Sequence, residues 1–125
     1  MAVSEPGADR RLARAEIEVG LAAHPGWYVL ADGSAIYACY RFEHAVQAIL
    51  FANFFGAVAR IAPFDLAFMI EIGACWAGVG IGAEKDDGIT PGAFVVAEVA
   101  DMVARVNCAI EASEDERGGL ATSRR

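Results

Sequence analysis

Apolar side chains recur with a helical period near the start of the chain. Between residues 9 and 23 a few large apolar residues stand among charged ones at spacings that place them on one face of a helix, which predicts an amphipathic helix. Its buried stripe is expected to comprise Leu12, Ile17 and Leu21. We expect Asp9 to cap this helix and the Pro25-Gly26 pair to follow its end, because proline disfavours helix in the residue before it.

Two runs of aromatic and β-branched residues follow, at 27–30 and 35–42, with Asp32-Gly33 between them. This combination predicts a β-hairpin. Side chains alternate across a strand, so the second run should divide into two faces. One face would carry Ile36, Ala38, Tyr40 and Phe42, and the other Tyr37, Cys39 and Arg41.

The second half of the chain changes period twice. Residues 43–62 have helical spacing, residues 66–82 alternate, and the helical period returns after Thr90, which precedes a proline and is expected to cap the last helix. We expect the first helix to bury Val46, Ile49, Leu50, Phe54, Ala57, Val58 and Ile61. The last helix should bury Val95, Val99, Met102, Val103, Val106 and Ile110. The alternating run predicts one long strand, bent in its glycine-rich second half, with Glu71 and Trp76 on opposite faces.

The predicted order is helix, strand, strand, helix, strand, helix, which indicates a single α+β domain over residues 9–111. Residues 1–8 are expected to be flexible, and the charged residues 112–125 are expected to form a disordered tail. The long last strand would offer an apolar edge. Such an edge can pair with a second chain, so we expect a homodimer with a continuous sheet.

Composition narrows the classes of partner. The net charge is −7, and the chain contains 17 acidic and 10 basic residues, so neither nucleic acid nor an anionic membrane surface is an expected partner. A mean hydropathy of +0.37 is high for a soluble domain. The apolar stretches 45–62 and 66–83 approach the length of a membrane span but contain polar residues. Burial between subunits accounts better for this hydropathy.

The residues that could carry chemistry are few. Three widely spaced cysteines and two isolated histidines, His24 and His44, give no metal or redox spacing, so we expect no metal and a cytoplasmic location. The glycines at 78, 80 and 82 do not open a helix directly, so close backbone packing explains them better than phosphate binding. Glu71 lies in an apolar strand and must be exposed, paired or functional. Trp76 belongs to the aromatic residues that often anchor interfaces. Glu71 and Trp76 are the candidate partner-binding residues.

The order of several short motifs resembles that of the pterin-4a-carbinolamine dehydratase family over about residues 8–111. The motifs are Gly26-Trp27, Asp32-Gly33 with Ala35-Ile36, Tyr40-Arg41-Phe42, Val58-Ala59, Gly88-Ile89-Thr90 and Val99-Ala100. The resemblance implies a small antiparallel sheet with helices on one face, and assembly into dimers or tetramers.

The chain departs from this family where the family's catalytic histidines occur. Leu66, Ala67 and Phe68 occupy the first region and Glu84 the second, and no histidine follows His44. Dehydration needs a group that moves a proton to the leaving hydroxyl, so we assign no catalytic residue and no cofactor here.

A dehydratase-like chain without these histidines is similar to the Rubisco assembly factor branch associated with α-carboxysomes. The resemblance implies a non-catalytic chaperone whose partner is the Rubisco large subunit, in the cytoplasm and associated with carboxysomes. Two alternatives stay open. One is a divergent dehydratase that uses Glu84 or Glu71, and the other is a regulatory dimerisation partner of another protein.

Overall fold

The computed structural model describes residues 10–83 and 88–110. Its elements, in chain order, are α1 (Arg14–Ala23), β1 (Tyr28–Val29), β2 (Ala35–Arg41), α2 (Ala45–Ile61), β3 (Leu66–Ile72), β4 (Trp76–Ala83) and α3 (Pro91–Val106). The predicted α+β class with a small antiparallel sheet is confirmed. The expectations for residues 1–8, for Asp9, for Glu84 and for residues 112–125 lie outside the described residues.

The sheet has four strands in the order β1-β2-β4-β3, and each neighbouring pair is antiparallel. The prediction of one strand over 66–82 was therefore wrong. Residues 73–75 form a tight turn between β3 and β4, in which the amide of Gly73 donates to the carbonyl of Trp76 at 2.9 Å. The turn places Glu71 opposite Gly78. Residues opposite each other on antiparallel strands point to the same face of the sheet. The even-numbered residues of β4 therefore lie on the same face as Glu71, whereas the single-strand prediction put them on the other face.

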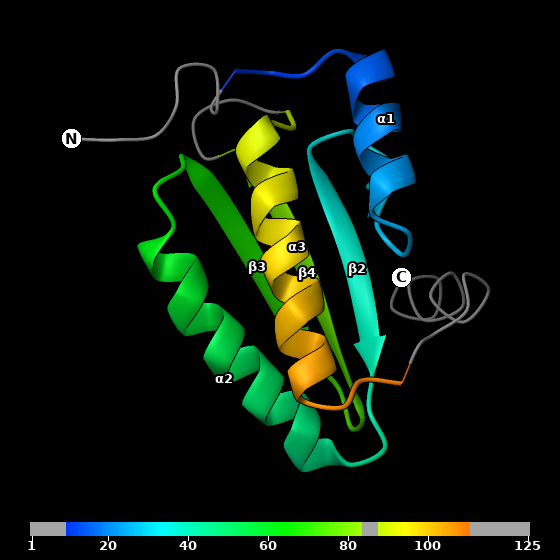
Figure 1. The fold of residues 1–125 in the computed structure, drawn as a ribbon, viewed down its shortest axis with the longest axis vertical. Coiled ribbons are helices and arrows are strands. Elements are labelled where there is room, and N and C mark those ends of the chain that lie inside the picture. The colour runs from blue at the N-terminus through cyan, green and yellow to red at the C-terminus, as the bar shows by residue number, and fades with distance from the viewer. Residues whose placement is uncertain (1–9, 84–87, 111–125) are drawn as a thin grey trace.

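The helices cover one face of the sheet, as expected (Figure 1). In that view α3 crosses in front of the strands, and α2 lies beside it. The core between these layers contains alternate residues of β2 and β4 and the aromatic side chains Phe51 and Phe55 of α2. Their rings are parallel, with centroids 5.8 Å apart, and the Phe51 ring lies 5.0 Å from that of Tyr40. The prediction that Ile36, Ala38, Tyr40 and Phe42 share one face is thus confirmed.

The predicted buried faces of α2 and α3 were mostly wrong. The residues of α2 that face the core are Ala48, Phe51, Ala52, Phe55 and Ala59. The residues expected there, Val46, Ile49, Leu50, Phe54 and Ile61, are exposed. In α3, Val95, Met102 and Val106 are likewise exposed, whereas Val103 is buried as expected, and Ile110 lies beyond the helix. Both helices carry apolar residues on more than one face, so periodicity alone did not identify the buried one.

The helix ends also differ from the predictions. Helix α1 begins at Arg14, and Glu16 stabilises its start by accepting the amide of Ala13 at 2.9 Å. The Arg10 guanidinium donates to the same carboxylate at 2.8 Å. Thr90 and its following proline do begin α3, but the Thr90 hydroxyl is buried and has no hydrogen-bond partner among the described residues. None of the helices in the described ranges combines the length and apolar character that a bilayer crossing needs.

Candidate functional site

The face of the sheet opposite the helices carries both candidate partner-binding residues. The register of β3 and β4 puts Glu71 beside Gly78. Trp76 precedes Gly78 by two residues in β4, so its side chain points to the same face. Both side chains are partly exposed. The prediction that they lie on opposite faces was wrong, because the hairpin turn restarts the alternation. The structure therefore brings the two residues onto one surface, near the end of the hairpin.

Tyr37 links this surface to β2. Its hydroxyl donates to Oε1 of Glu71 at 2.7 Å, across the intervening strand β4. A Cβ atom built on Gly78 would lie only 2.0 Å from the Tyr37 hydroxyl oxygen. The glycines of β4 thus make room for side chains that lie flat on the sheet. This confirms close packing as the reason for the glycine alternation. Glu71 is a hydrogen-bonded carboxylate at the edge strand.

The positions that correspond to the dehydratase histidines lie at the start of β3. Leu66 is buried in the core and Ala67 is exposed on the helix-free face. Phe68 points to the helix side, where its ring packs edge-on against Phe55 with centroids 6.2 Å apart. None of these three side chains can transfer a proton, and Glu84 lies outside the described residues.

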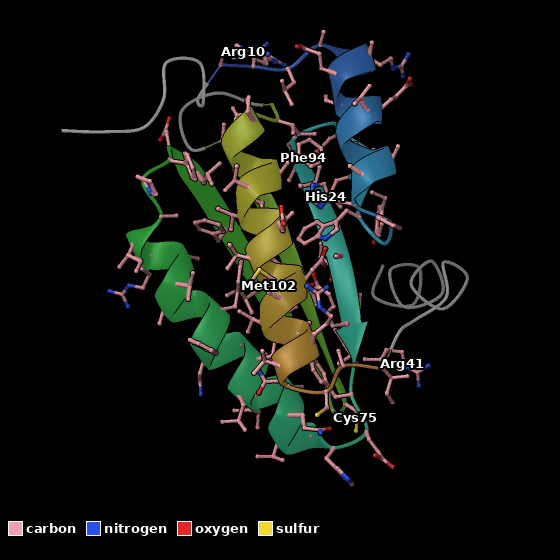
Figure 2. All side chains as sticks on the ribbon, viewed as in Figure 1. Arg10, His24, Arg41, Cys75, Phe94 and Met102 are labelled. Carbon is pink, nitrogen blue, oxygen red and sulfur yellow. The ribbon has the colours of Figure 1, made fainter. Side chains whose placement is uncertain are left out.

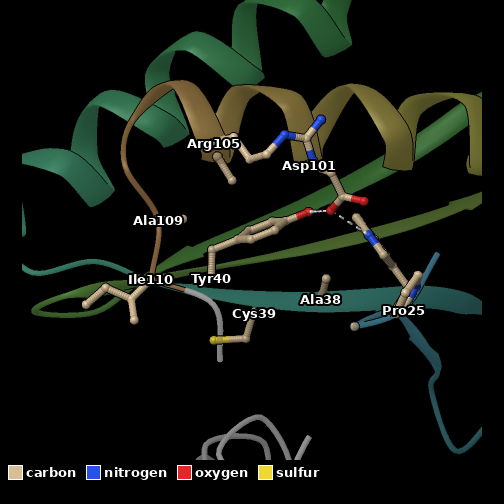
Figure 3. A pocket seen from close by; sticks show the side chains of 11 residues that line it. Pro25, Ala38, Cys39, Tyr40, Asp101, Arg105, Ala109 and Ile110 are labelled. Atoms are coloured by element: carbon tan, nitrogen blue, oxygen red, sulfur yellow. Dashed lines mark hydrogen bonds between the residues drawn. The ribbon is translucent and has the colours of Figure 1, made fainter. Parts of the chain in front are cut away.

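A cavity of about 560 Å³ is lined in part by β2. In the strand order β1-β2-β4-β3, it therefore lies in the half of the sheet away from the edge strand β3. Figure 3 shows it between β2 and the C-terminal half of α3. Its walls come from the turn after α1, from β2, from α3 and from the segment that follows α3. The lining residues are Pro25, Gly26, Trp27, Ala38, Cys39, Tyr40, Asp101, Ala104, Arg105, Ala109 and Ile110.

One carboxylate organises the polar part of this cavity. Oδ1 of Asp101 accepts the indole N–H of Trp27 at 3.1 Å and the hydroxyl of Tyr40 at 2.5 Å (Figure 3). Burial, followed by the negative charge of Asp101, raises the pKa of Tyr40 well above its ordinary value. Tyr40 therefore keeps its proton at neutral pH and remains a donor. Sequence reasoning missed this cluster, because Trp27 and Asp101 are 74 residues apart.

The two histidines lie outside this cluster. His24 follows α1, and its ring stacks on Phe94 of α3 with centroids 5.7 Å apart (Figure 2). His44 precedes α2, where its backbone amide donates to the side chain of Gln47 at 2.9 Å. The His24 ring thus has a packing role, and the backbone of His44 takes part in the start of α2. Within the described part of the chain, no three His, Cys, Asp or Glu side chains form a group that could hold a metal ion.

Comparison with known proteins supports the fold class. No protein-family model and no curated protein matches the chain. Among solved structures, it is similar to a transcriptional coactivator/pterin dehydratase from Brucella melitensis, with a TM-score of 0.69 and 20% sequence identity. The match covers 76% of this chain and 99% of that one. The chain therefore has the pterin dehydratase-like fold.

Proposed function

We propose that this protein is a non-catalytic, homodimeric binding protein that acts as an assembly factor for the Rubisco large subunit, in the cytoplasm and associated with carboxysomes. The apolar outward face of α2 is the observation that carries a binding role. Exposed fractions are 56% for Val46, 51% for Leu50, 52% for Phe54 and 80% for Ile61. A stripe of large exposed apolar side chains along a helix is expected to be covered by a partner.

The spacing of this face favours a second copy as its occupant. Val46 and Leu50 lie as far before the midpoint between Asn53 and Phe54, near the centre of α2, as Ile61 and Ala57 lie after it. A two-fold axis at that midpoint would set Val46 of one copy opposite Ile61 of the other. Such self-complementarity is what a two-fold symmetric dimer requires. We therefore place the dimer contact on α2, whereas a continuous sheet would use the open edge of β3.

Cross-linking tests this contact directly. Under mild oxidation, the double variant Val46→Cys, Ile61→Cys should form a covalent dimer. Val46→Cys alone should not, because antiparallel helices would hold the two introduced thiols about 22 Å apart at 1.5 Å per residue. The unsubstituted chain controls for its three native cysteines. Covalent dimers of the single variant would instead indicate parallel helices.

A charge on the same stripe should disrupt the dimer. Leu50→Glu is expected to raise the dissociation constant about 100-fold, as for a central interface residue. Val19→Glu is the matched control, because Val19 is an exposed apolar residue on α1. Sedimentation velocity across a dilution series gives the constant. A dimer that persists unchanged in Leu50→Glu would refute the α2 contact and favour the β3 edge.

The helix-free face is the proposed contact for Rubisco. Glu71 and Trp76 lie on it near the end of the β3–β4 hairpin, away from the α2 stripe. A tagged chain should enrich the Rubisco large subunit from its native cell extract, as read by mass spectrometry. Glu71→Lys should abolish this enrichment. Tyr37→Phe should retain it, because that variant removes the hydrogen bond to Glu71 without changing the charge. Recovery of no large subunit with the unsubstituted chain would refute the assignment.

A divergent dehydratase is the second candidate, favoured by the similarity in fold to a protein named pterin dehydratase. It requires turnover of the carbinolamine above the uncatalysed rate, and loss of that turnover in Glu84→Gln or Glu71→Gln. We expect the purified chain to give no acceleration. A measured acceleration that Glu84→Gln or Glu71→Gln abolishes would replace the binding role with catalysis.

A further inference from the structure

The cavity beside β2 contains an acidic and a basic residue that do not pair with each other. Asp101 and Arg105 are four residues apart on α3, a spacing at which opposite charges commonly form an ion pair on a helix surface. Within the described ranges, neither side chain is in a salt bridge. Asp101 turns instead toward Trp27 and Tyr40, and Arg105 stays exposed at the cavity. Two opposite charges therefore face the same space.

The Asp101 carboxylate still has an oxygen available. Both of its hydrogen bonds go to Oδ1, so Oδ2 accepts none from the described residues. Oδ2 is also not among the buried polar atoms that lack a partner, so it retains exposed surface on a residue that lines the cavity. The neutral donors Trp27 and Tyr40 orient this charge without neutralising it. An N–H donor that carries positive charge would complete the site.

The remaining walls are mainly small and apolar. Ala38, Ala104 and Ala109 leave the space that larger side chains would fill, and Pro25 and Ile110 extend the apolar surface. The volume of about 560 Å³ is within the range of pockets that hold small molecules. An apolar group of moderate size fits these walls without a further polar partner.

We propose that this cavity binds a zwitterionic α-amino acid with an apolar side chain. The ammonium group would donate to Oδ2 of Asp101, and the carboxylate would bind the Arg105 guanidinium. The side chain would lie against the alanine wall and the Trp27 ring. A simple anion would meet the charge of Asp101, and a simple cation that of Arg105, so a ligand with both charges is the best match. This role is independent of the proposed assembly function.

Matched ligands test both charges. The probes are L-leucine, L-methionine and L-phenylalanine, measured by calorimetry and by Trp27 fluorescence in a Trp76→Phe background, since the chain has two tryptophans. N-acetyl-L-leucine lacks the ammonium, and L-leucinamide lacks the carboxylate. We expect at least one amino acid to bind and its two derivatives to bind more than about tenfold more weakly. Equal binding of the derivatives, or no binding by any of the three amino acids, would overturn the proposal.

Matched variants test the residues. Arg105→Gln should weaken binding of the amino acid more than about tenfold and leave binding of L-leucinamide unchanged. Asp101→Asn keeps an oxygen for Trp27 and Tyr40 and should weaken the amino acid and L-leucinamide alike. Arg60→Gln, an exposed arginine on α2, is the control and should change neither. Thermal unfolding of each variant confirms that it is folded. Unchanged affinity in a folded Arg105→Gln would remove Arg105 from the site.

Discussion

Replacement of Asp101 by alanine is the most direct test of the polar cluster in the cavity. The variant removes the acceptor of two hydrogen bonds, one from the indole of Trp27 and one from the hydroxyl of Tyr40. Trp27 is only 5% exposed, so its N–H has little access to bulk water. Each buried donor left without an acceptor costs about 1–3 kcal/mol, which sets a range of roughly 2–6 kcal/mol for the pair.

Access of water through the cavity should bring the cost of Asp101→Ala toward the lower end of this range. Asp101 borders a space of about 560 Å³, so water can enter and partly replace the lost carboxylate. We therefore expect Asp101→Ala to lower the free energy of unfolding by about 2–3 kcal/mol. That is a large part of the roughly 5–15 kcal/mol that stabilises a typical domain. Urea unfolding, followed by tryptophan fluorescence and by circular dichroism, gives the value.

Two further variants separate the hydrogen bonds from the loss of volume. Asp101→Asn retains an oxygen acceptor and should cost less than half as much as Asp101→Ala. Tyr40→Phe removes one of the two donors, so Asp101→Ala should cost less in its presence than alone. A cost below about 0.5 kcal/mol for Asp101→Ala, within the usual range for surface substitutions, would refute a structural role for the carboxylate. An equal cost for the alanine and asparagine variants would attribute the effect to something other than these hydrogen bonds.

Three other outcomes follow from the described contacts. The Arg10 guanidinium and a backbone amide hold the pKa of Glu16 down to about 2, so the start of α1 should be unaffected above pH 4.5 and lose this contribution as the pH falls through about 2. Amide chemical shifts at the start of α1 should follow that titration in the native chain and not in Glu16→Gln. Gly78→Ala should displace the Tyr37 ring and cost about 1–3 kcal/mol in urea unfolding, because the added Cβ would lie 2.0 Å from its hydroxyl oxygen. Gly80→Ala should cost less, because its nearest neighbour is the end of a flexible methionine at 3.0 Å; an equal or greater cost would contradict this explanation.

The fold class could be predicted because local signals and tertiary structure agree for most elements. Aromatic and β-branched runs around Asp32-Gly33 do form the hairpin β1–β2, and Pro91 does begin α3. The second hairpin was missed because its turn does not interrupt the alternation. Residues 73–75 continue the same sequence of small and apolar side chains, so the pattern fits one strand as well as two. Gly73, the first residue of the turn, was the available signal, and a glycine also fits a bend in a single strand.

The buried faces of the helices could not be predicted for a different reason. Large apolar residues on α2 face outward, whereas alanines and two phenylalanines face the sheet. Hydrophobicity points to the larger residues, but close approach of helix and sheet favours small ones. Only the position of the sheet decides between the two stripes. The cavity is a similar case, because no sequence spacing joins Asp101 of α3 to Trp27 and Tyr40.

The wrong prediction of the buried face of α2 changes the interpretation of the high mean hydropathy. The sequence suggested that the excess apolar surface lies along a sheet edge. The structure places much of it on the outward stripe of α2 and on Val95, Met102 and Val106 of α3. These two helices pack against each other on the same side of the sheet. An interface on that side would leave the helix-free face, with Glu71 and Trp76, open for a different partner. A dimer built on α2 and a partner bound to the sheet can therefore coexist.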